Sequence, residues 1–312
     1  MSDKILLLEN TRFYRLAPNQ WSMALLKRFE SNYKTLGYAE MNEELVDHLN
    51  TGRYKQYILM FYLPPGYTLK VDFTSYKTEQ PSFFFLSNNQ HFQIWQTNEE
   101  KAGHFIFFNT DFYCVQIHDA EVACDGILFN NIYNLAMTPV AQADEADIEY
   151  IFKKLIEELD EKDVSQEEMI RTYLKQLIIM ATRMWKIQQF NPASHKIKKD
   201  IEIYRAFSRM VGTQFRKKHT VTAYADQLGM AAKNLTATLS RLNLPAPSDI
   251  IKDRLVLEAK RLLCHSPYSA KEIAHQLGFD DPAYFNRLFT KRVGASPGVF
   301  KKQYLSEENV QR

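Results

Sequence analysis

A short pattern that ends in a glycine occurs twice in this chain, 49 residues apart. The two copies read Ala225-Asp-Gln-Leu-Gly229-Met230 and Ala274-His-Gln-Leu-Gly278-Phe279. A helix that ends in a left-handed residue favours glycine there, because a side chain would clash with the backbone. The alanine four residues earlier is small enough for a second helix to cross closely. Each copy therefore predicts two short helices joined by a tight corner.

The segment after each corner has the periodicity of a second helix. Apolar residues recur four positions apart, as Leu235 and Leu239 in the first copy and Phe285 and Phe289 in the second. This is the helix-turn-helix layout, in which the second helix enters the major groove of DNA. One such pattern is weak, since any helical hairpin with a glycine corner resembles it. Two copies at matched spacing are much stronger.

The second copy has better helix-start signals than the first. Ser269-Ala-Lys-Glu272 is a capping box, and Asp281-Pro282 suits the start of the following helix. In the first copy Thr222 is the expected cap of the first helix. The second helix of that copy opens with Ala231-Ala232, which offers no capping side chain.

A helical rod is predicted between the two copies. In residues 248–267, Ile251, Leu255 and Leu262 form one apolar stripe. About 16 helical residues span about 24 Å, so the rod can hold two reading helices on one face of a duplex, whose successive major-groove segments lie about 34 Å apart. One monomer could then bind an asymmetric site.

Charge divides the chain into two halves. Residues 1–190 carry 18 Lys and Arg against 26 Asp and Glu, a net −8, whereas residues 191–312 carry 21 against 11, a net +10. A basic C-terminal part suits a polyanionic partner. Chance, or a basic domain docked on an acidic one, would give the same asymmetry.

The N-terminal half reads as strands followed by helices. Residues 57–118 hold aromatic and β-branched runs separated by turn signals, which favours a small barrel or sandwich. Residues 20–50 look helical in two stretches, "WSMALLKRFESNY" and "MNEELVDHL". The aromatic residues of the strands serve as core or line a ligand pocket, and core is the commoner role. They are Phe83, Phe84, Phe85, Phe92, Trp95, Phe105, Phe107 and Phe108.

Two amphipathic helices are predicted next. One covers 144–160, and the other starts at a Ser165-Gln-Glu-Glu168 capping box. The pair packs on the barrel, on a second subunit, or on both. The polar stretch 188–199 is the expected linker. From Ile197 onward the chain reads as helical, with breaks at Gly212, Gly229, Pro245–Pro247, Pro267, Gly278 and Gly294.

Several functional classes lack a signature. His91, His104 and His118 are isolated and show no metal-binding pair, and there is no phosphate loop or nucleophile elbow. Cys114, Cys124 and Cys264 have no metal-type spacing and are expected to be reduced thiols. No run is apolar enough for a membrane span or signal peptide. We therefore expect a cytoplasmic, non-enzymatic protein without cofactor or metal.

Residues 272–302, "EIAHQLGFDDPAYFNRLFTKRVGASPGVFKK", together with Tyr304 and "RLVLEAKRLL" at 254–263, resemble the AraC/XylS family of bacterial transcription regulators. The resemblance is close over about 200–305 and only general in the N-terminal half. It implies an α+β chain: a cupin-like sensor or dimerisation barrel over 1–140, a helical linker pair over 141–190, and an all-α double helix-turn-helix domain over 195–305.

The resemblance also implies the residues that face double-stranded DNA. The first reading helix would offer Lys233, Asn234 and Thr236. The second would offer Ala283, Asn286 and Arg287. Lys233 suits guanine acceptors, Asn286 suits adenine, Ala283 suits a thymine methyl and Arg287 suits a phosphate.

The first copy departs from the family pattern. Ala231, Ala237, Leu239-Ser240 and Leu244-Pro-Ala-Pro247 replace residues that are usual there. Base reading by the first copy is therefore in question, and phosphate contact is its alternative role.

The expected partners are duplex DNA, a small-molecule effector in the barrel, a second copy of the chain, and RNA polymerase if the protein is an activator. A barrel that serves only dimerisation, and repression in place of activation, stay open. The alternative of a different class is a cupin-type binder or enzyme whose helical tail is a protein-interaction module.

Overall fold

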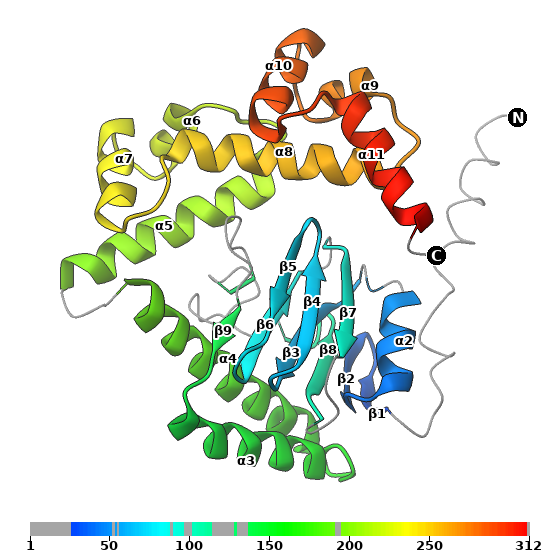
Figure 1. The fold of residues 1–312 in the computed structure, drawn as a ribbon. Helices are drawn as coiled ribbons and strands as arrows, with labels where there is room; N and C mark the ends of the chain where they lie inside the picture. Colours follow the sequence, from blue (N-terminus) through cyan, green and yellow to red (C-terminus); the bar gives the residue numbers. More distant parts are fainter. Residues whose placement is uncertain are drawn as a thin grey trace, which may run out of the picture.

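The computed structural model describes residues 26–51, 54, 56–87, 90–96, 102–113, 128–129, 137–190 and 195–310. Strands come first along the chain and helices follow (Figure 1). The strands and the helix among them are β1 (Lys27–Ser31), β2 (Lys34–Glu40), α2 (Glu43–Thr51), β3 (Ile58–Leu63), β4 (Tyr67–Val71), β5 (Thr74–Lys77), β6 (Ser82–Leu86), β7 (Phe92–Gln96), β8 (His104–Phe108) and β9 (Thr138–Pro139).

These strands form two antiparallel sheets. The larger has the order β1-β2-β8-β3-β6-β9 and the smaller the order β5-β4-β7. Side chains alternate along a strand, so the two faces of β3 enter different cores. Leu59, Phe61 and Leu63 meet the smaller sheet, whereas Ile58 and the other even-numbered residues lie in the core shared with the helices. Burial on both faces explains why β3 is apolar throughout.

The predicted succession of a sheet region, a helical pair and an all-α region is confirmed. Among the described strands the two sheets face each other without pairing, so the layout is cupin-like but not a closed barrel. The helical reading of "WSMALLKRFESNY" is wrong over Lys27–Ser31, which is β1 paired with β2. That of "MNEELVDHL" is confirmed by α2. The sequence of residues 27–31 taken alone does not reveal that they pair with β2, and this pairing makes them a strand.

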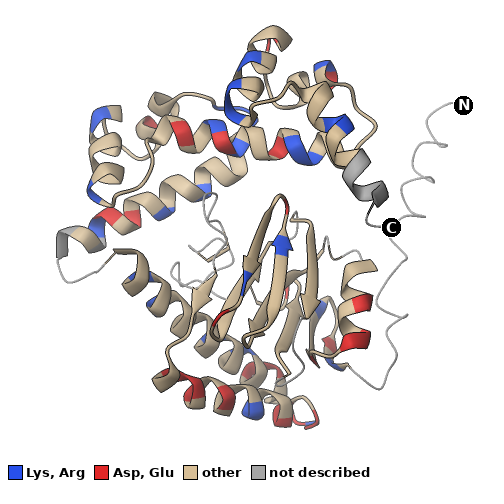
Figure 2. Ribbon diagram, in the orientation of Figure 1, with Lys and Arg blue, Asp and Glu red and all other residues tan. Residues whose placement is uncertain are grey.

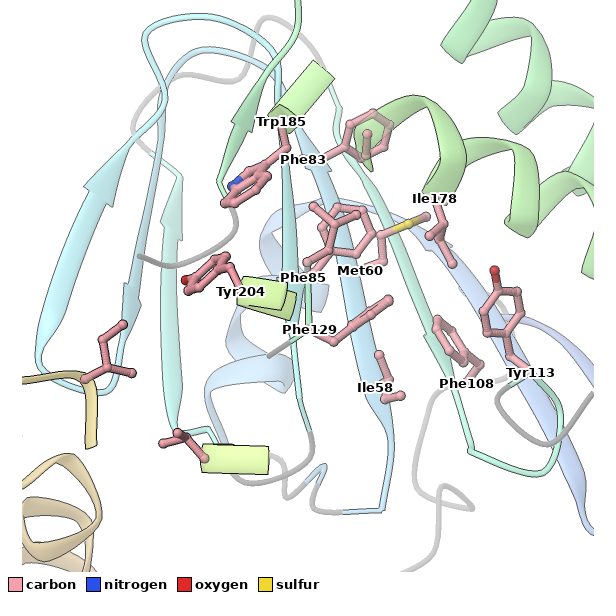
Figure 3. Packing of buried hydrophobic residues seen from close by; sticks show 14 of the residues in the cluster. Ile58, Met60, Phe83, Phe85, Phe108, Tyr113, Phe129, Ile178, Trp185 and Tyr204 are labelled. Carbon is pink, nitrogen blue, oxygen red and sulfur yellow. The ribbon is translucent and has the colours of Figure 1, made fainter. Parts of the chain in front are cut away.

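The helical pair covers the outer face of the larger sheet. It consists of α3 (Gln142–Glu158) and α4 (Gln166–Phe190). Figure 3 shows Ile178 and Trp185 beside Met60, Phe83 and Phe85 of the sheet. The pair therefore packs on the sheet of its own chain, which two of the three predicted arrangements require.

The Ser165 capping box is not observed at the start of α4. The Ser165 hydroxyl donates to Asp163, and Glu168 pairs with Arg171. The buried Arg171 also donates to the Phe112 carbonyl at 3.0 Å. The tertiary position of Arg171 therefore draws Glu168 away from the helix terminus.

The rest of the chain is helical and lies on the other side of the sheets from α3 (Figure 1). The predicted break at Gly212 is wrong, because α5 runs through it. The other predicted breaks fall between helices, except that Pro247 is the first residue of α8. The helices are α5 (His195–Gln214), α6 (Val221–Gln227), α7 (Ala232–Arg241), α8 (Pro247–His265), α9 (Ala270–Gln276), α10 (Pro282–Val293) and α11 (Pro297–Val310).

No helix in the described part of the chain is both long and apolar enough to cross a bilayer. Cys114, Cys124 and His118 lie outside the described residues, as does part of the predicted linker.

Candidate nucleic-acid interface

The two glycine corners have the same backbone geometry. Gly229 has φ +65° and Gly278 has φ +81°, both in the left-handed region. In each copy the amide of the next residue donates to the carbonyl of the small alanine, from Met230 to Ala225 and from Phe279 to Ala274, both at 3.0 Å. This closes the helix end with the bond expected of a Schellman motif. Both repeats therefore fold as predicted.

Capping follows the predicted contrast between the copies, with one correction. The Ser269–Glu272 capping box and the Asp281 cap are present in the second copy. Ala231, at the start of α7, has no side-chain cap. The predicted Thr222 cap is wrong. Thr220 caps α6 by accepting from the Ala223 amide at 3.3 Å, because the helix starts two residues earlier than that prediction requires.

The second helix of each unit buries one face and exposes the other. Leu235 and Leu239 of α7 are fully buried, as is Phe289 of α10, and Phe285 is nearly so. In Figure 1, α10 lies on the side of α8 away from the sheets, and α7 lies beside the N-terminal end of α8.

All six residues expected to face DNA are exposed: Lys233, Asn234, Thr236, Ala283, Asn286 and Arg287. Two of them already make contacts within the protein. The Thr236 hydroxyl donates to the Ala232 carbonyl at 3.1 Å, which limits what it can offer a base. The Arg287 guanidinium lies 3.6 Å from Asp281, with both side chains largely exposed. Contact of these residues with DNA stays a prediction.

Lys291 is a further candidate on α10 that the sequence reasoning did not single out. It is exposed and follows Ala283 and Arg287 at steps of four, so the three share one face of the helix. The helical spacing in the sequence was sufficient to find it. The neighbouring Arg292 has a different role, because it pairs with Asp249 and, at 3.1 Å, with Asp253 of α8. Figure 2 shows basic residues along α7 and α10.

The rod helix α8 joins the two units, as predicted. Its 19 residues correspond to about 28 Å. A second link was not predicted. The His219 ring, just before α6, donates from Nε2 to the Leu277 carbonyl at 3.0 Å. A side chain at Gly278 would overlap the carbonyl of Arg216, so this corner is pressed against the segment after α5. The two units therefore form one body.

An ion network surrounds Glu258 of α8, which is largely buried. Glu258 accepts from Arg216 at 2.7 Å and from Arg254 at 2.9 Å, and Arg261 lies 3.6 Å away. Desolvation raises the pKa of the Glu258 carboxyl, but the surrounding guanidiniums outweigh it and hold that pKa below its usual range. Burial lowers the pKa of Arg254, which stacks 3.8 Å from the ring centroid of Phe215. The network connects α8 to the start of the first unit.

The described histidines of the sheet region do not form a metal site. His104 lies 2.9 Å from the Tyr38 hydroxyl and 3.0 Å from Glu149, while His91 stacks on His265. Within the described residues, no three metal-ligating side chains come together. These contacts tie β8 to α3 and the sheets to α8.

Residues 224–303 match the model of a family described as "Helix-turn-helix domain". The chain is 22% identical over 246 residues to the uncharacterized HTH-type transcriptional regulator YfiF of Bacillus subtilis, covering 77% of this chain and 74% of the relative. It is 23% identical over 166 residues to the lactose operon transcription activator of Staphylococcus xylosus, covering 52% and 57%. Across the relatives it matches, the chain spans from 10% to 74% of their length.

Among solved structures, ToxT of Vibrio cholerae O395 bound to (E)-4-(8-methylnaphthalen-1-yl)but-3-enoic acid aligns with a TM-score of 0.37 and 15% identity. The alignment covers 90% of this chain and 98% of ToxT.

Proposed function

We propose that this chain, a member of the AraC/XylS-type family of helix-turn-helix regulators, binds specific duplex DNA and regulates transcription. One observation carries the proposal. Two helix-turn-helix units are joined into one body, and every residue expected to face DNA on α7 and α10 is exposed. Two exposed reading helices on one body suit successive major-groove segments.

The two helices divide the recognition between them. On α10, Asn286 would pair with adenine and Ala283 would contact a thymine methyl, while Arg287 and Lys291 neutralise phosphates. On α7, Lys233 would donate to guanine, with Thr236 almost one turn further along the same face and Asn234 next to Lys233. Arg287 exchanges Asp281 for a phosphate, which costs little because both groups are exposed.

The regulator acts as an activator and contacts RNA polymerase, which agrees with the activator among its relatives. Residues 1–140 form the sensor or dimerisation domain and residues 141–190 the connecting pair, with the DNA-binding domain over 195–305. An effector bound by the sheet region, and a homodimer, complete the proposal. Their support is the family resemblance. The protein is not an enzyme.

Selection from a random duplex library with the full chain tests the proposal. We expect enrichment of a motif with two recognised segments about 10 base pairs apart. Arg287→Ala should weaken binding to the enriched duplex by about tenfold and lower the salt slope by about one. The control is Arg183→Ala, an exposed arginine on α4, which should bind like wild type. No enrichment, together with no duplex binding at low salt, would overturn the proposal.

A further inference from the structure

A direct contact joins the two helix-turn-helix units in addition to the rod helix α8. The His219 ring, at the start of the first unit, donates from Nε2 to the Leu277 carbonyl of the second unit at 3.0 Å. The same ring lies 4.8 Å from the ring of Phe279. Beside it, a Cβ added at Gly278 would lie 2.0 Å from the Arg216 carbonyl oxygen, so the two backbones approach closely. We call the contact of His219 with Leu277 and Phe279 the latch.

On the first unit, both neighbours of His219 are fixed to helix α6. Thr220 caps α6 by accepting from the Ala223 amide. The Tyr224 hydroxyl, from within α6, donates to the Lys218 carbonyl at 2.9 Å, and the Tyr224 side chain is fully buried. Helix α6 in turn packs against the reading helix α7. The position of the His219 ring is therefore set by the first unit.

On the second unit, the latch reaches the core beneath the reading helix. Leu277 and Phe279 flank the corner glycine, and the Phe279 amide donates to the Ala274 carbonyl at 3.0 Å. The Phe279 ring lies 5.4 Å from that of Phe285, which is buried on the inner face of α10. The latch therefore connects α6 to the corner on which α10 is packed.

The rod by itself leaves a joint between the units. Residues 266–269, between the end of α8 and the start of α9, are not helical. Contacts of α10 with α8 steady this joint, since Arg292 lies 3.1 Å from Asp253. Those contacts hold the second unit on the rod, whereas the latch holds it against the first unit. The latch therefore acts on the placement of α10 relative to α7.

This placement matters because a duplex is read in steps of one base pair. One base pair advances the duplex by about 3.4 Å and turns it by about a tenth of a turn. The 3.0 Å bond from His219 to Leu277 is lost once its atoms separate by more than about 0.5 Å. A chain that shifted its two reading helices by one such step would therefore break the latch.

We propose that His219 is a positioning residue for DNA recognition: the latch fixes how far apart along a duplex the segments read by α7 and α10 must lie. This rests on the proposed function. A site with altered spacing costs the hydrogen bond of the latch in addition to any strain in the duplex. His219 contributes to specificity through spacing and not through base contact, because its Nε2 is bonded within the protein.

Two substitutions of His219 separate the hydrogen bond from the presence of a side chain. His219→Ala removes the donor and the ring, whereas His219→Gln keeps an N–H donor of similar reach. The control is His275→Ala, at an exposed position on α9 of the second unit, which leaves the latch intact. The probes are the duplex selected by the wild-type chain and derivatives with one base pair inserted or removed between its two recognised segments.

The readout is the ratio of the full chain's affinities for the selected duplex and for the respaced derivatives. His219→Ala should lower this ratio about fivefold, the effect of one lost hydrogen bond of ordinary strength. His219→Gln and His275→Ala should keep the wild-type ratio. An unchanged ratio in His219→Ala, or a selected motif with a single recognised segment, would overturn the proposal. Failure of wild type to select any duplex would instead contradict the proposed function.

A measurement without DNA tests the latch even if His219→Ala binds no duplex. Spin labels are attached after Ser240→Cys on α7 and Thr290→Cys on α10, both exposed positions, in a full chain whose three native cysteines are replaced by serine. Double electron–electron resonance should give a narrow distance distribution in this chain and with His219→Gln, and a broader one with His219→Ala. Equal widths for all three would overturn the proposal.

Discussion

The two helix-turn-helix units share one backbone design but differ in how firmly their surroundings impose it. Both corners have a left-handed glycine and the same closing hydrogen bond. The second unit adds a capping box, an aspartate cap and a corner glycine that lies against the Arg216 carbonyl. The first has an uncapped α7, and nothing lies near the position of a side chain at Gly229. A shared motif therefore does not imply shared energetics.

Substitution of the two corner glycines should show the largest difference. Gly278→Ala adds a methyl group that overlaps the Arg216 carbonyl in a strained conformation, and should lower the free energy of unfolding by about 4 kcal/mol. Gly229→Ala meets only the backbone strain and should cost about 1 kcal/mol. Urea unfolding of both variants measures the gap. Equal losses would mean that the corners are equivalent.

Substitution of Glu258, which lies where the first unit meets α8, should have the next largest effect on the free energy of unfolding. Glu258→Gln leaves Arg216 and Arg254 with a neutral partner and should cost about 3 kcal/mol at neutral pH. The folded pKa of Glu258 lies below that of an unfolded glutamate, so this contribution is complete above the unfolded pKa and is lost as pH falls through the folded one. The difference from wild type in unfolding free energy should therefore close in acid.

The control for this effect is Glu202→Gln, at an exposed position on α5. It should stay within about 0.5 kcal/mol of wild type at every pH. A Glu258 variant whose deficit does not change with pH would show that packing, and not charge, stabilises the network.

The asparagines of the two reading helices provide a matched test of base reading. Asn286→Ala on α10 should reduce the preference for the selected duplex over a mixed-sequence one by about tenfold, because a bidentate contact to adenine is lost. Asn234→Ala on α7 should change that preference by less than about threefold. Competition binding with both duplexes measures the two ratios. A larger loss of preference for Asn234→Ala would show that α7, and not α10, contributes more to base recognition.

Capping should give the smallest effects, of opposite sign in the two units. Asp281→Ala removes the acceptor for the Ala283 amide, 2.8 Å away, and should cost about 1 kcal/mol. Ala231→Ser supplies the cap that α7 lacks and should gain up to about 1 kcal/mol. Thermal unfolding of the pair measures both shifts. No gain from Ala231→Ser would show that the start of α7 is set by packing instead.

Prediction from the sequence succeeded where the signal is local. The corner glycines, the Ser269–Glu272 box and the apolar stripe of α3 depend on residues within a few positions of one another. Lys291 was within reach of the same reasoning, since it repeats the four-residue step of Ala283 and Arg287.

Prediction failed where a distant partner decides. The strand at Lys27–Ser31 exists through its pairing with β2, and Glu168 leaves its expected cap position for Arg171, which is fixed by Phe112. The predicted break at Gly212 is wrong for another reason. The apolar periodicity of α5 outweighs the modest cost of one glycine in a helix interior, so the helix continues through it.

The sequence by itself determined the two helix-turn-helix units, because turn chemistry, capping and helical periodicity act over short distances along the chain. Only the tertiary structure decided which contacts join the two units to each other and to the sheets. The close approach of Gly278 to the Arg216 carbonyl and the hydrogen bonds between Asp72 and Arg261 join residues 62 and 189 positions apart. Contacts at such separations depend on how whole layers pack, and no periodicity in the chain encodes them.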